Sequence, residues 1–234
     1  MLLLQKNKMN TIVDNLQTIK AQLYENVQLI AVSKLKSEEE IMQAYQAGQR
    51  LFGENYVQEL SQKYTNLPKD ILWHHIGHLQ SNKIKYIIPF VACIQGIDSE
   101  KLLQEVNKQA AKHKRIVDVL LQFHIAQEET KFGFDMQEAI SMLENENFKN
   151  LTSVRICGVM GMATFTDNKE MVRKEFRLLK NYFDMLKEKY FAQNEYFSQI
   201  SMGMTDDFDV AMQEGSTMVR IGSAIFGKRI YKNL

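Results

Sequence analysis

The sequence has little cysteine, little proline and no long apolar run. Only two of its 234 residues are cysteine, Cys93 and Cys157, and both lie within apolar segments. So few cysteines exclude a disulfide-stabilised secreted scaffold, and we interpret both as small core residues of a reduced protein. The two prolines, Pro68 and Pro89, and the absence of any low-complexity tract leave no candidate linker. We therefore predict one domain over residues 1–234.

Neither sign of charge is in excess. Lysine and arginine together number 29 against 28 aspartates and glutamates, so the formal net charge is +1. This balance gives no electrostatic reason to expect binding to nucleic acid or to an anionic membrane. No segment approaches the roughly 18 apolar residues of a membrane span, and the start MLLLQKNKMN lacks the features of a secretion signal. We expect a cytoplasmic protein that contacts neither nucleic acid nor membrane.

The most prominent feature is an alternation of short β-prone runs with helix-like segments. The runs cover residues 27–33, 50–55, 71–77, 90–97, 116–125, 153–162, 197–203 and 217–222. They are almost continuously apolar, as expected of parallel strands that are buried on both faces. The pattern predicts an α/β fold, a (β/α)8 TIM barrel with an extra N-terminal helix within residues 1–26 that covers one barrel end. An open doubly wound sheet is the alternative.

Several helix boundaries can be read directly. Ser37 followed by Glu40 predicts a capping box at the start of a helix over 37–48, and Asp98 or Ser99 precedes the helix over 99–114. Gly48 and Gly215 stand where a helix would end.

Lys34 ends the first apolar run, in LIAVSK. The active face of such a barrel is the carboxyl end of its strands, so Lys34 stands where a reactive group is expected. A partly desolvated lysine has a lowered pKa and can attack an aldehyde. Lys36, two residues later, would help to lower that pKa if both side chains enter the cleft. The alternative is a surface lysine that happens to follow a strand.

The segment QISMGMTDDFDVAMQEGSTMVRIGSAIFG (199–227) contains two glycine- and serine-rich turns, after the seventh and eighth strands. Barrels of this type often bind phosphate between these loops and a short helix. Ser201 and Ser223 would supply hydroxyl groups, while Gly203 and Gly222 would let backbone amides approach. Ordinary turn chemistry is the alternative.

Arg220 interrupts the otherwise apolar run TMVRIG. A buried arginine needs a partner. Two partners are open: a structural carboxylate, or a ring nitrogen of a bound heterocycle.

Further polar residues follow the second and third strands. Asn55 stands at a strand end, where it would bind a ligand or start a turn, and His74, His75 and His78 lie close together. Neighbouring residues of a strand point to opposite faces, so the histidine spacing is poor for a metal site. Met160 and Met162 share one face of the sixth strand, as core filler or as contacts of an aromatic ring.

The segments AVSK, FGENYVQE, WHHIGHLQSNK and SMGMTDDFDVAMQEGSTMVRIGSAIFG resemble the pyridoxal-phosphate homeostasis protein family, a single-domain relative of the alanine racemase barrel. The resemblance covers about residues 27–229. It implies that Lys34 forms a Schiff base with pyridoxal 5′-phosphate (PLP), that Ser201, Gly222 and Ser223 hold the phosphate, and that Arg220 faces the pyridine nitrogen. Asn55 and Met160 would line the ring pocket. Ser37 and His124 depart from the family pattern, and His124 would alter the polarity near the ring.

The resemblance implies a carrier or regulator of PLP in vitamin B6 homeostasis rather than an enzyme. A fixed cation at the pyridine nitrogen disfavours its protonation and weakens the ring as an electron sink. The chain ends soon after the last strand, so we expect no second domain to supply a base. Racemisation needs a proton acceptor on each face, and beyond Lys34 we find no convincing second one. The rival interpretations are an amino-acid racemase or related PLP enzyme, and a Schiff-base aldolase of sugar phosphates. We expect a monomer or weak dimer whose partners are PLP and apo forms of PLP-dependent enzymes.

Overall fold

The computed structural model describes residues 11–127 and 132–227. Within them, eight parallel strands close into a barrel in sequence order, and β8 pairs with β1. The strands are β1 (Gln28–Val32), β2 (Leu51–Glu54), β3 (Leu72–His75), β4 (Cys93–Ile97), β5 (Val117–Gln122), β6 (Val154–Met160), β7 (Gln199–Ser201) and β8 (Met218–Ile221). Every strand lies inside a predicted run. The predicted (β/α)8 barrel is therefore confirmed, and the open sheet is wrong.

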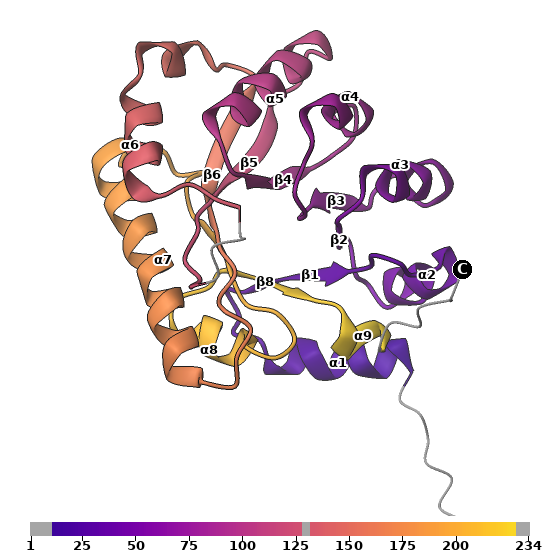
Figure 1. Cartoon of the computed structure of the whole chain (residues 1–234). Coiled ribbons are helices and arrows are strands. Elements are labelled where there is room, and N and C mark those ends of the chain that lie inside the picture. The colour runs from indigo at the N-terminus through magenta and orange to yellow at the C-terminus, as the bar shows by residue number, and fades with distance from the viewer. Residues whose placement is uncertain (1–10, 128–131, 228–234) are drawn as a thin grey trace, which may run out of the picture.

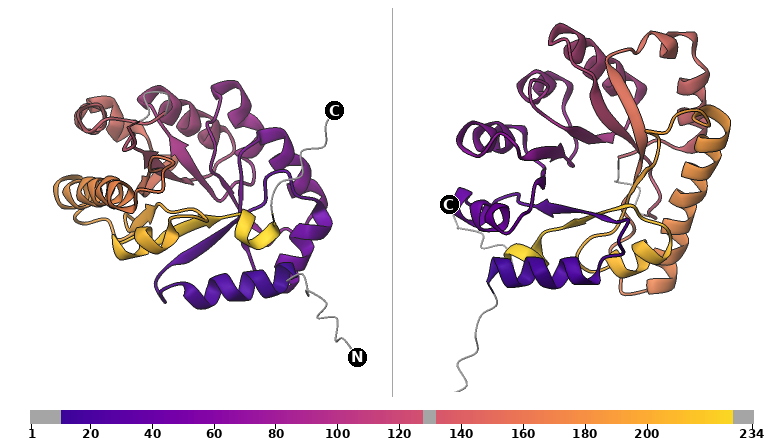
Figure 2. Two further views of the ribbon diagram at one scale, coloured as in Figure 1. Left: turned by 60° about the horizontal axis from the view of Figure 1, so that its bottom comes forward. Right: turned by 180° about the vertical axis from the view of Figure 1, so that it is seen from behind.

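Helices surround the strands, as Figures 1 and 2 show. They are α1 (Ile12–Gln22), α2 (Glu38–Gln46), α3 (Val57–Asn66), α4 (Ile84–Ile87), α5 (Glu100–Lys112), α6 (Met136–Glu144), α7 (Lys169–Tyr190), α8 (Phe208–Gln213) and α9 (Ser223–Phe226), with 3-10 turns η1 (Ser81–Lys83) and η2 (Glu146–Asn150). No helix in the described part of the chain is both long enough and apolar enough to cross a membrane.

The predicted helix boundaries are confirmed. Ser37 Oγ accepts from the Glu40 amide at 3.2 Å, and Glu40 Oε2 accepts from the Ser37 amide at 2.8 Å, which is the predicted capping box. Ser99 caps α5. Gly48 and Gly215 follow α2 and α8 with φ of 87° and 92°, a backbone conformation that favours glycine. Ser37, a departure from the family pattern, thus has a local role as a helix cap.

The N-terminal helix is present, but its predicted place over a barrel end is wrong. α1 packs against α2 and α9, on the outside of the strands (Figure 2). Asn15 Nδ2 donates to the Ile225 carbonyl of α9 at 3.0 Å, while the other end of α1 leads into the start of β1. The reason is that α9 has only four residues and leaves the outer face of β8 and β1 to be covered by another helix.

The core has an outer and an inner part. Outward-facing side chains of the strands pack against the helices, as in the pair Phe52 and Trp73, whose ring centroids are 5.8 Å apart. Inside the barrel, a smaller buried cluster contains Cys93, Leu120, Cys157 and Met160. Both cysteines are buried and free, as predicted.

A bulge in β6 decides which of its residues face inward. The pairing with β5 shifts register between Val119 and Leu120, opposite Gly158. Gly158 has φ of 153°, and a Cβ there would lie 1.8 Å from the Gln199 carbonyl oxygen, so only glycine fits. The extra residue lets Cys157 and Met160, three positions apart, enter the same inner cluster.

Candidate functional site

The carboxyl ends of β1, β2, β6, β7 and β8 surround a cavity of about 600 Å³. Its walls come mainly from the loops that follow these strands. The predicted site residues Lys34, Asn55, Arg220, Gly222 and Ser223 all line it. Residues that lie far apart in the chain thus meet at the end of the barrel where chemistry is expected.

Lys34 sits in a tight turn directly after β1, and its side chain is half-buried at the cavity wall. The Lys36 amide donates to the Ser33 carbonyl at 3.0 Å and closes the turn. Lys36 itself points elsewhere, because its Nζ donates to Glu40 Oε1 at 3.1 Å and to the Phe226 carbonyl at 2.7 Å. Only Lys34 of the two lysines therefore lines the cavity, and Lys36 does not enter the cleft beside it.

A buried ionic cluster supports this turn. Lys63 Nζ donates to Glu54 Oε1 at 2.8 Å, to Glu59 Oε1 at 2.6 Å and to the Ser33 carbonyl at 2.7 Å. Ser33 Oγ donates to Glu54 Oε1 at 2.6 Å. Burial raises the pKa of Glu54 to about 7, more than the nearby Lys63 ammonium lowers it, and the Glu59 charge adds to the increase.

Arg220 extends from β8 toward β7 and the end of β6, and it lines the cavity. Its Nη1 donates to the Ser201 carbonyl at 2.8 Å and to Ser201 Oγ at 2.6 Å, and its Nη2 donates to the Gly161 carbonyl at 3.0 Å. Burial lowers the pKa of Arg220 to about 10, against the opposing effect of the nearby Asp207 carboxylate. Arg220 is therefore a fixed cation at neutral pH.

Asn55 carries a buried oxygen without a hydrogen-bond partner among the described residues. This atom, Oδ1, is inaccessible to solvent. A buried amide oxygen left without a donor costs free energy. Asn55 also lines the cavity, so this oxygen is a candidate acceptor at the site.

The loops after β7 and β8 lie next to each other at the cavity. Ser223 Oγ, at the start of α9, donates to Thr205 Oγ1 at 3.1 Å, and Gly222 precedes it. Ser223 is exposed to solvent, unlike the ionic cluster beside Lys34. Two hydroxyl groups thus gather near the amides of a helix start, a suitable arrangement for phosphate oxygens.

Comparisons with known proteins agree with this geometry. The family described as alanine racemase, N-terminal domain, matches residues 8–230. The pyridoxal phosphate homeostasis proteins of Aquifex aeolicus and Pasteurella multocida are 38% and 40% identical, covering 87% and 88% of this chain and the same shares of their own. The human protein of that name is 37% identical over 87% of this chain and 77% of its own. The chain belongs to the pyridoxal phosphate homeostasis protein family.

Solved structures extend the comparison. PipY of Synechococcus elongatus, solved with PLP bound, superposes with a TM-score of 0.84 at 32% identity, covering 93% of this chain and all of that one. An alanine racemase from Bartonella henselae shares the fold, with a TM-score of 0.69 at 16% identity over 93% of this chain and 60% of its own. The predicted resemblance to this family is confirmed.

Ser201, which the family resemblance assigns to the phosphate, is bonded inside the barrel. It is fully buried in the barrel and is not among the residues that line the cavity. Its Oγ donates to Gln95 Oε1 at 2.7 Å and accepts from Arg220. Gln95 Nε2 in turn lies 2.9 Å from His74 Nδ1. The Ser201 hydroxyl is therefore bonded to Gln95 and Arg220 inside the barrel.

Met160, which the family resemblance assigns to the ring pocket, is not among the residues that line the cavity. It belongs to the inner cluster, whereas Met162 lines the cavity. The two methionines face the same way, but successive inward residues of a tilted strand occupy different layers of the barrel. Met162, one layer closer to the carboxyl end, is the methionine that a ligand in the cavity would touch.

Sequence reasoning missed the loop between β6 and α7. Thr164, Phe165, Thr166 and Asp167 line the cavity. Glu175 of α7 accepts from the Thr164 amide at 2.7 Å and from the Thr164 hydroxyl at 2.8 Å, and so anchors this loop. A signal existed, because a glutamate on the buried face of a helix needs a partner.

The histidines have separate environments. His74 bonds Gln95 inside the barrel, His75 is fully buried with its pKa lowered to about 4 by burial, and His78 Nδ1 lies 2.9 Å from Asp98 Oδ2. No group of three His, Cys, Asp or Glu side chains in the described ranges is arranged to hold a metal ion. His124, the other departure from the family pattern, does not line the cavity.

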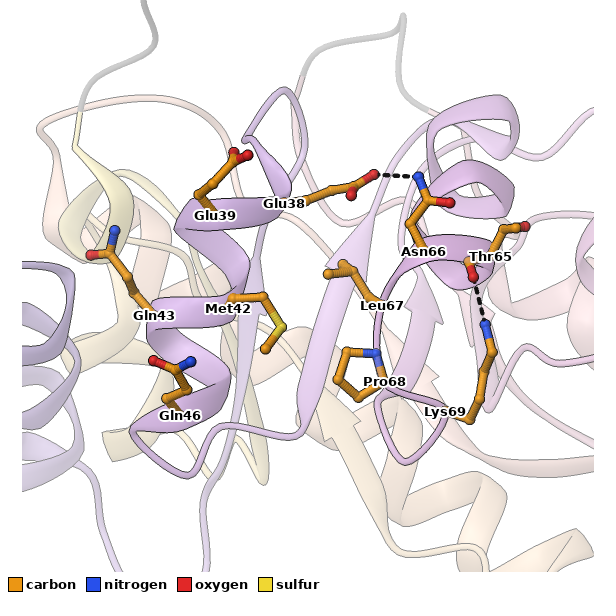
Figure 3. Close-up of a pocket in the computed structure, with 10 residues that line it drawn as sticks. All are labelled: Glu38, Glu39, Met42, Gln43, Gln46, Thr65, Asn66, Leu67, Pro68 and Lys69. Carbon is orange, nitrogen blue, oxygen red and sulfur yellow. Dashed lines mark hydrogen bonds between the residues drawn. The ribbon is translucent and has the colours of Figure 1, made fainter.

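A larger, shallower hollow of about 850 Å³ lies on the outside of the barrel (Figure 3). Side chains of α2 form one wall and the end of α3 with Pro68 and Lys69 forms the other, bridged by Asn66 Nδ2 donating to Glu38 Oε1 at 2.7 Å. It brings no convergent set of catalytic groups together, so the cavity at the strand ends is the candidate site.

Proposed function

We propose that the protein binds PLP in the cavity as a Schiff base on Lys34, and that it stores and releases the cofactor rather than turning over amino acids. The observation that carries this proposal is that the Lys34 amine, the Arg220 cation and the hydroxyl-bearing loops after β7 and β8 line one cavity. An amine, a cation and a phosphate site are the three groups that a phosphorylated aldehyde heterocycle requires.

The residues of the cavity fit the cofactor. The Lys34 amine would add to the aldehyde carbon, so that a C=N bond forms and one water leaves. The Arg220 guanidinium would face the pyridine nitrogen, and the buried Asn55 oxygen would bind a donor group. Gly222, Ser223 and Thr205 would hold the phosphate, while Ser201 would keep Arg220 in place. When bound, PLP supplies an electrophilic aldehyde and an electron sink.

Storage rather than turnover is supported by the Arg220 cation and by the names of the relatives. A cation fixed by carbonyl oxygens of Ser201 and Gly161 disfavours a proton on the facing ring nitrogen. The chain's relatives are named for homeostasis of the cofactor. Apo forms of PLP-dependent enzymes would be the recipients, and two buried free cysteines fit a reducing cytoplasm.

The binding half is tested by an absorbance spectrum of the purified protein with PLP, followed by borohydride reduction and peptide mass mapping. We expect an imine band and a fixed pyridoxyl-phosphate mass on Lys34. A label found chiefly on Lys36 would overturn the assignment, and a colourless protein would turn attention to sugar phosphates.

The storage half is tested by incubating the holoprotein with L-alanine in deuterated water. We expect release of the cofactor to the free amine without sustained exchange of the α-proton. Asp167 and Asp206 line the cavity, so an amino-acid racemase is the second candidate function. Rapid exchange with accumulation of the D-isomer would favour it. Restored activity of an apo PLP enzyme mixed with holoprotein is the positive result expected of a carrier.

A further inference from the structure

The turn that carries Lys34 adopts an unfavourable backbone conformation. Leu35 has φ of 62°, one of two non-glycine residues in the described ranges with a positive φ. For a residue with a Cβ, this region is disfavoured relative to ordinary conformations. The Leu35 side chain is 57% exposed, so its packing contributes little to holding the turn. Some other interaction must maintain it.

That interaction comes from the first helix after β2. Glu59 Oε1 accepts a hydrogen bond from the Leu35 amide at 2.6 Å. The same oxygen accepts from Lys63 Nζ at 2.6 Å, one helical turn further along α3. Lys63 also donates to the Ser33 carbonyl at 2.7 Å. The side chains of Glu59 and Lys63 therefore form hydrogen bonds with the backbone on both sides of Lys34.

Glu54 completes the arrangement from β2. Its Oε1 accepts from both Ser33 Oγ and Lys63 Nζ, and it is fully buried together with its lysine partner. None of Glu54, Glu59 or Lys63 lines the cavity. Their bonds converge instead on the residues before and after Lys34.

We infer that Glu59 and Lys63 are positioning residues for Lys34, holding the 33–36 turn in the conformation that presents the amine to the cavity. This inference rests on the proposed Schiff base at Lys34. It assigns a role to two charged residues, one of them within FGENYVQE, that the proposed binding site leaves unused. It also separates two properties: formation of the imine depends on the turn, whereas capture of the phosphate and ring does not.

Two ligands distinguish these properties. PLP forms the imine, while pyridoxine 5′-phosphate has an alcohol in place of the aldehyde and binds only through the ring and phosphate. Imine formation is followed by absorbance and by the borohydride-fixed mass on Lys34, and pyridoxine 5′-phosphate affinity by calorimetry. The variants are Glu59→Ala, the double variant Glu59→Ala with Leu35→Gly, and the control Glu144→Ala. Glu144 accepts from Lys189 and Tyr190, at 3.0 Å and 2.6 Å, and is not part of the cavity.

In Glu59→Ala we expect the equilibrium for imine formation to fall about tenfold, the effect of one lost charge-assisted hydrogen bond. Affinity for pyridoxine 5′-phosphate should stay unchanged. Glycine tolerates a positive φ without strain, so adding Leu35→Gly should restore imine formation. Equal losses for both ligands, no loss of imine, or no rescue by Leu35→Gly would each overturn the inference.

Leu35→Val provides a second route should Glu59→Ala fail to fold. It leaves every charged side chain intact, but a β-branched residue fits a positive φ worse than leucine does. We expect the same selective loss of imine formation. An unchanged imine equilibrium in this variant would also overturn the inference. If instead the parent protein gives no label on Lys34, the proposed function fails and not merely its positioning residues.

Discussion

The turn after β1 and the loops after β7 and β8 face the same cavity but are held in opposite ways. The first is tied by buried charges, because Lys63 and Glu59 bond its backbone on both sides of Lys34. The loops after β7 and β8 are more open, because Ser223 is exposed and its hydroxyl is bonded to the hydroxyl of Thr205. Under the proposed function the difference has a reason: an amine that forms a covalent bond must be held in one position, whereas loops that bind a phosphate must admit and release a charged ligand.

The largest expected effect follows from removing the Lys34 amine in the turn after β1. Lys34→Ala should abolish the imine band and the borohydride-fixed label, since no other amine is proposed to reach the aldehyde. Lys36→Ala is the matched control, because Lys36 is bonded to Glu40 and the Phe226 carbonyl instead of lining the cavity. Mass mapping of both variants checks this. A label that persists in Lys34→Ala would show that another amine forms the imine, and the turn after β1 would then not hold the reactive group.

The buried charges beside the turn after β1 should contribute to the free energy of unfolding. Lys63→Met leaves Glu54 and Glu59 without their cation, and breaking one partner of a buried pair costs about 3–5 kcal/mol. Lys189→Met, which removes an exposed pair with Glu144, should cost about 0–1 kcal/mol. Urea unfolding measures both free energies of unfolding. Equal losses in the two variants would show that the cluster gives the turn no special support.

The same cluster predicts a pH dependence. The pKa of Glu54 is raised to about 7, so between its ordinary value near 4.5 and 7 the folded protein keeps a proton that the unfolded chain has lost. Its contribution to stability is therefore greatest below pH 4.5 and is lost as the pH rises to about 7. Over this pH range, the contribution of Glu54 to the free energy of unfolding falls by about 3 kcal/mol.

Glu54→Gln, which cannot titrate, isolates this contribution. Unfolding free energies of parent and variant across that pH range should differ in slope, with the parent falling more steeply. Parallel curves would mean that Glu54 is ionised throughout.

The loops after β7 and β8 give the smallest expected loss of affinity, and variants there distinguish binding of the phosphate from binding of the ring. Ser223→Ala should weaken PLP binding by about 1.5–3 kcal/mol, or roughly 10- to 150-fold, and leave pyridoxal binding unchanged. Ser201→Ala should weaken PLP and pyridoxal equally, because its hydroxyl bonds Arg220 and Gln95. Calorimetry measures the affinity of each variant for PLP and for pyridoxal and so separates the two roles. A phosphate-specific loss in Ser201→Ala would restore the role that sequence reasoning assigned to it.

Much of the candidate site could be predicted from local signals. Lys34 and Arg220 each break an apolar run, and a charged group at such a position is recognisable without coordinates. Gln95 is likewise a polar residue within the apolar run FVACIQGI, and it bonds Ser201 and His74, but the sequence analysis did not single it out. The role of Ser201 is harder to predict, because a strand-end serine can direct its hydroxyl into the barrel or toward the loop, and the sequence does not distinguish these.

Local sequence patterns were enough to predict the eight strands, the helix caps and the end of the barrel where the amine lies, because alternation and capping are properties of a few neighbouring residues. Three further features could be seen only in the tertiary structure: the bulge at Gly158, the place of α1 in the outer layer, and the hydrogen bond from Lys63 to the Ser33 carbonyl. Each depends on register or on contacts between segments distant in the chain. Such contacts are fixed only when the barrel closes, since closure sets which side chains share a layer.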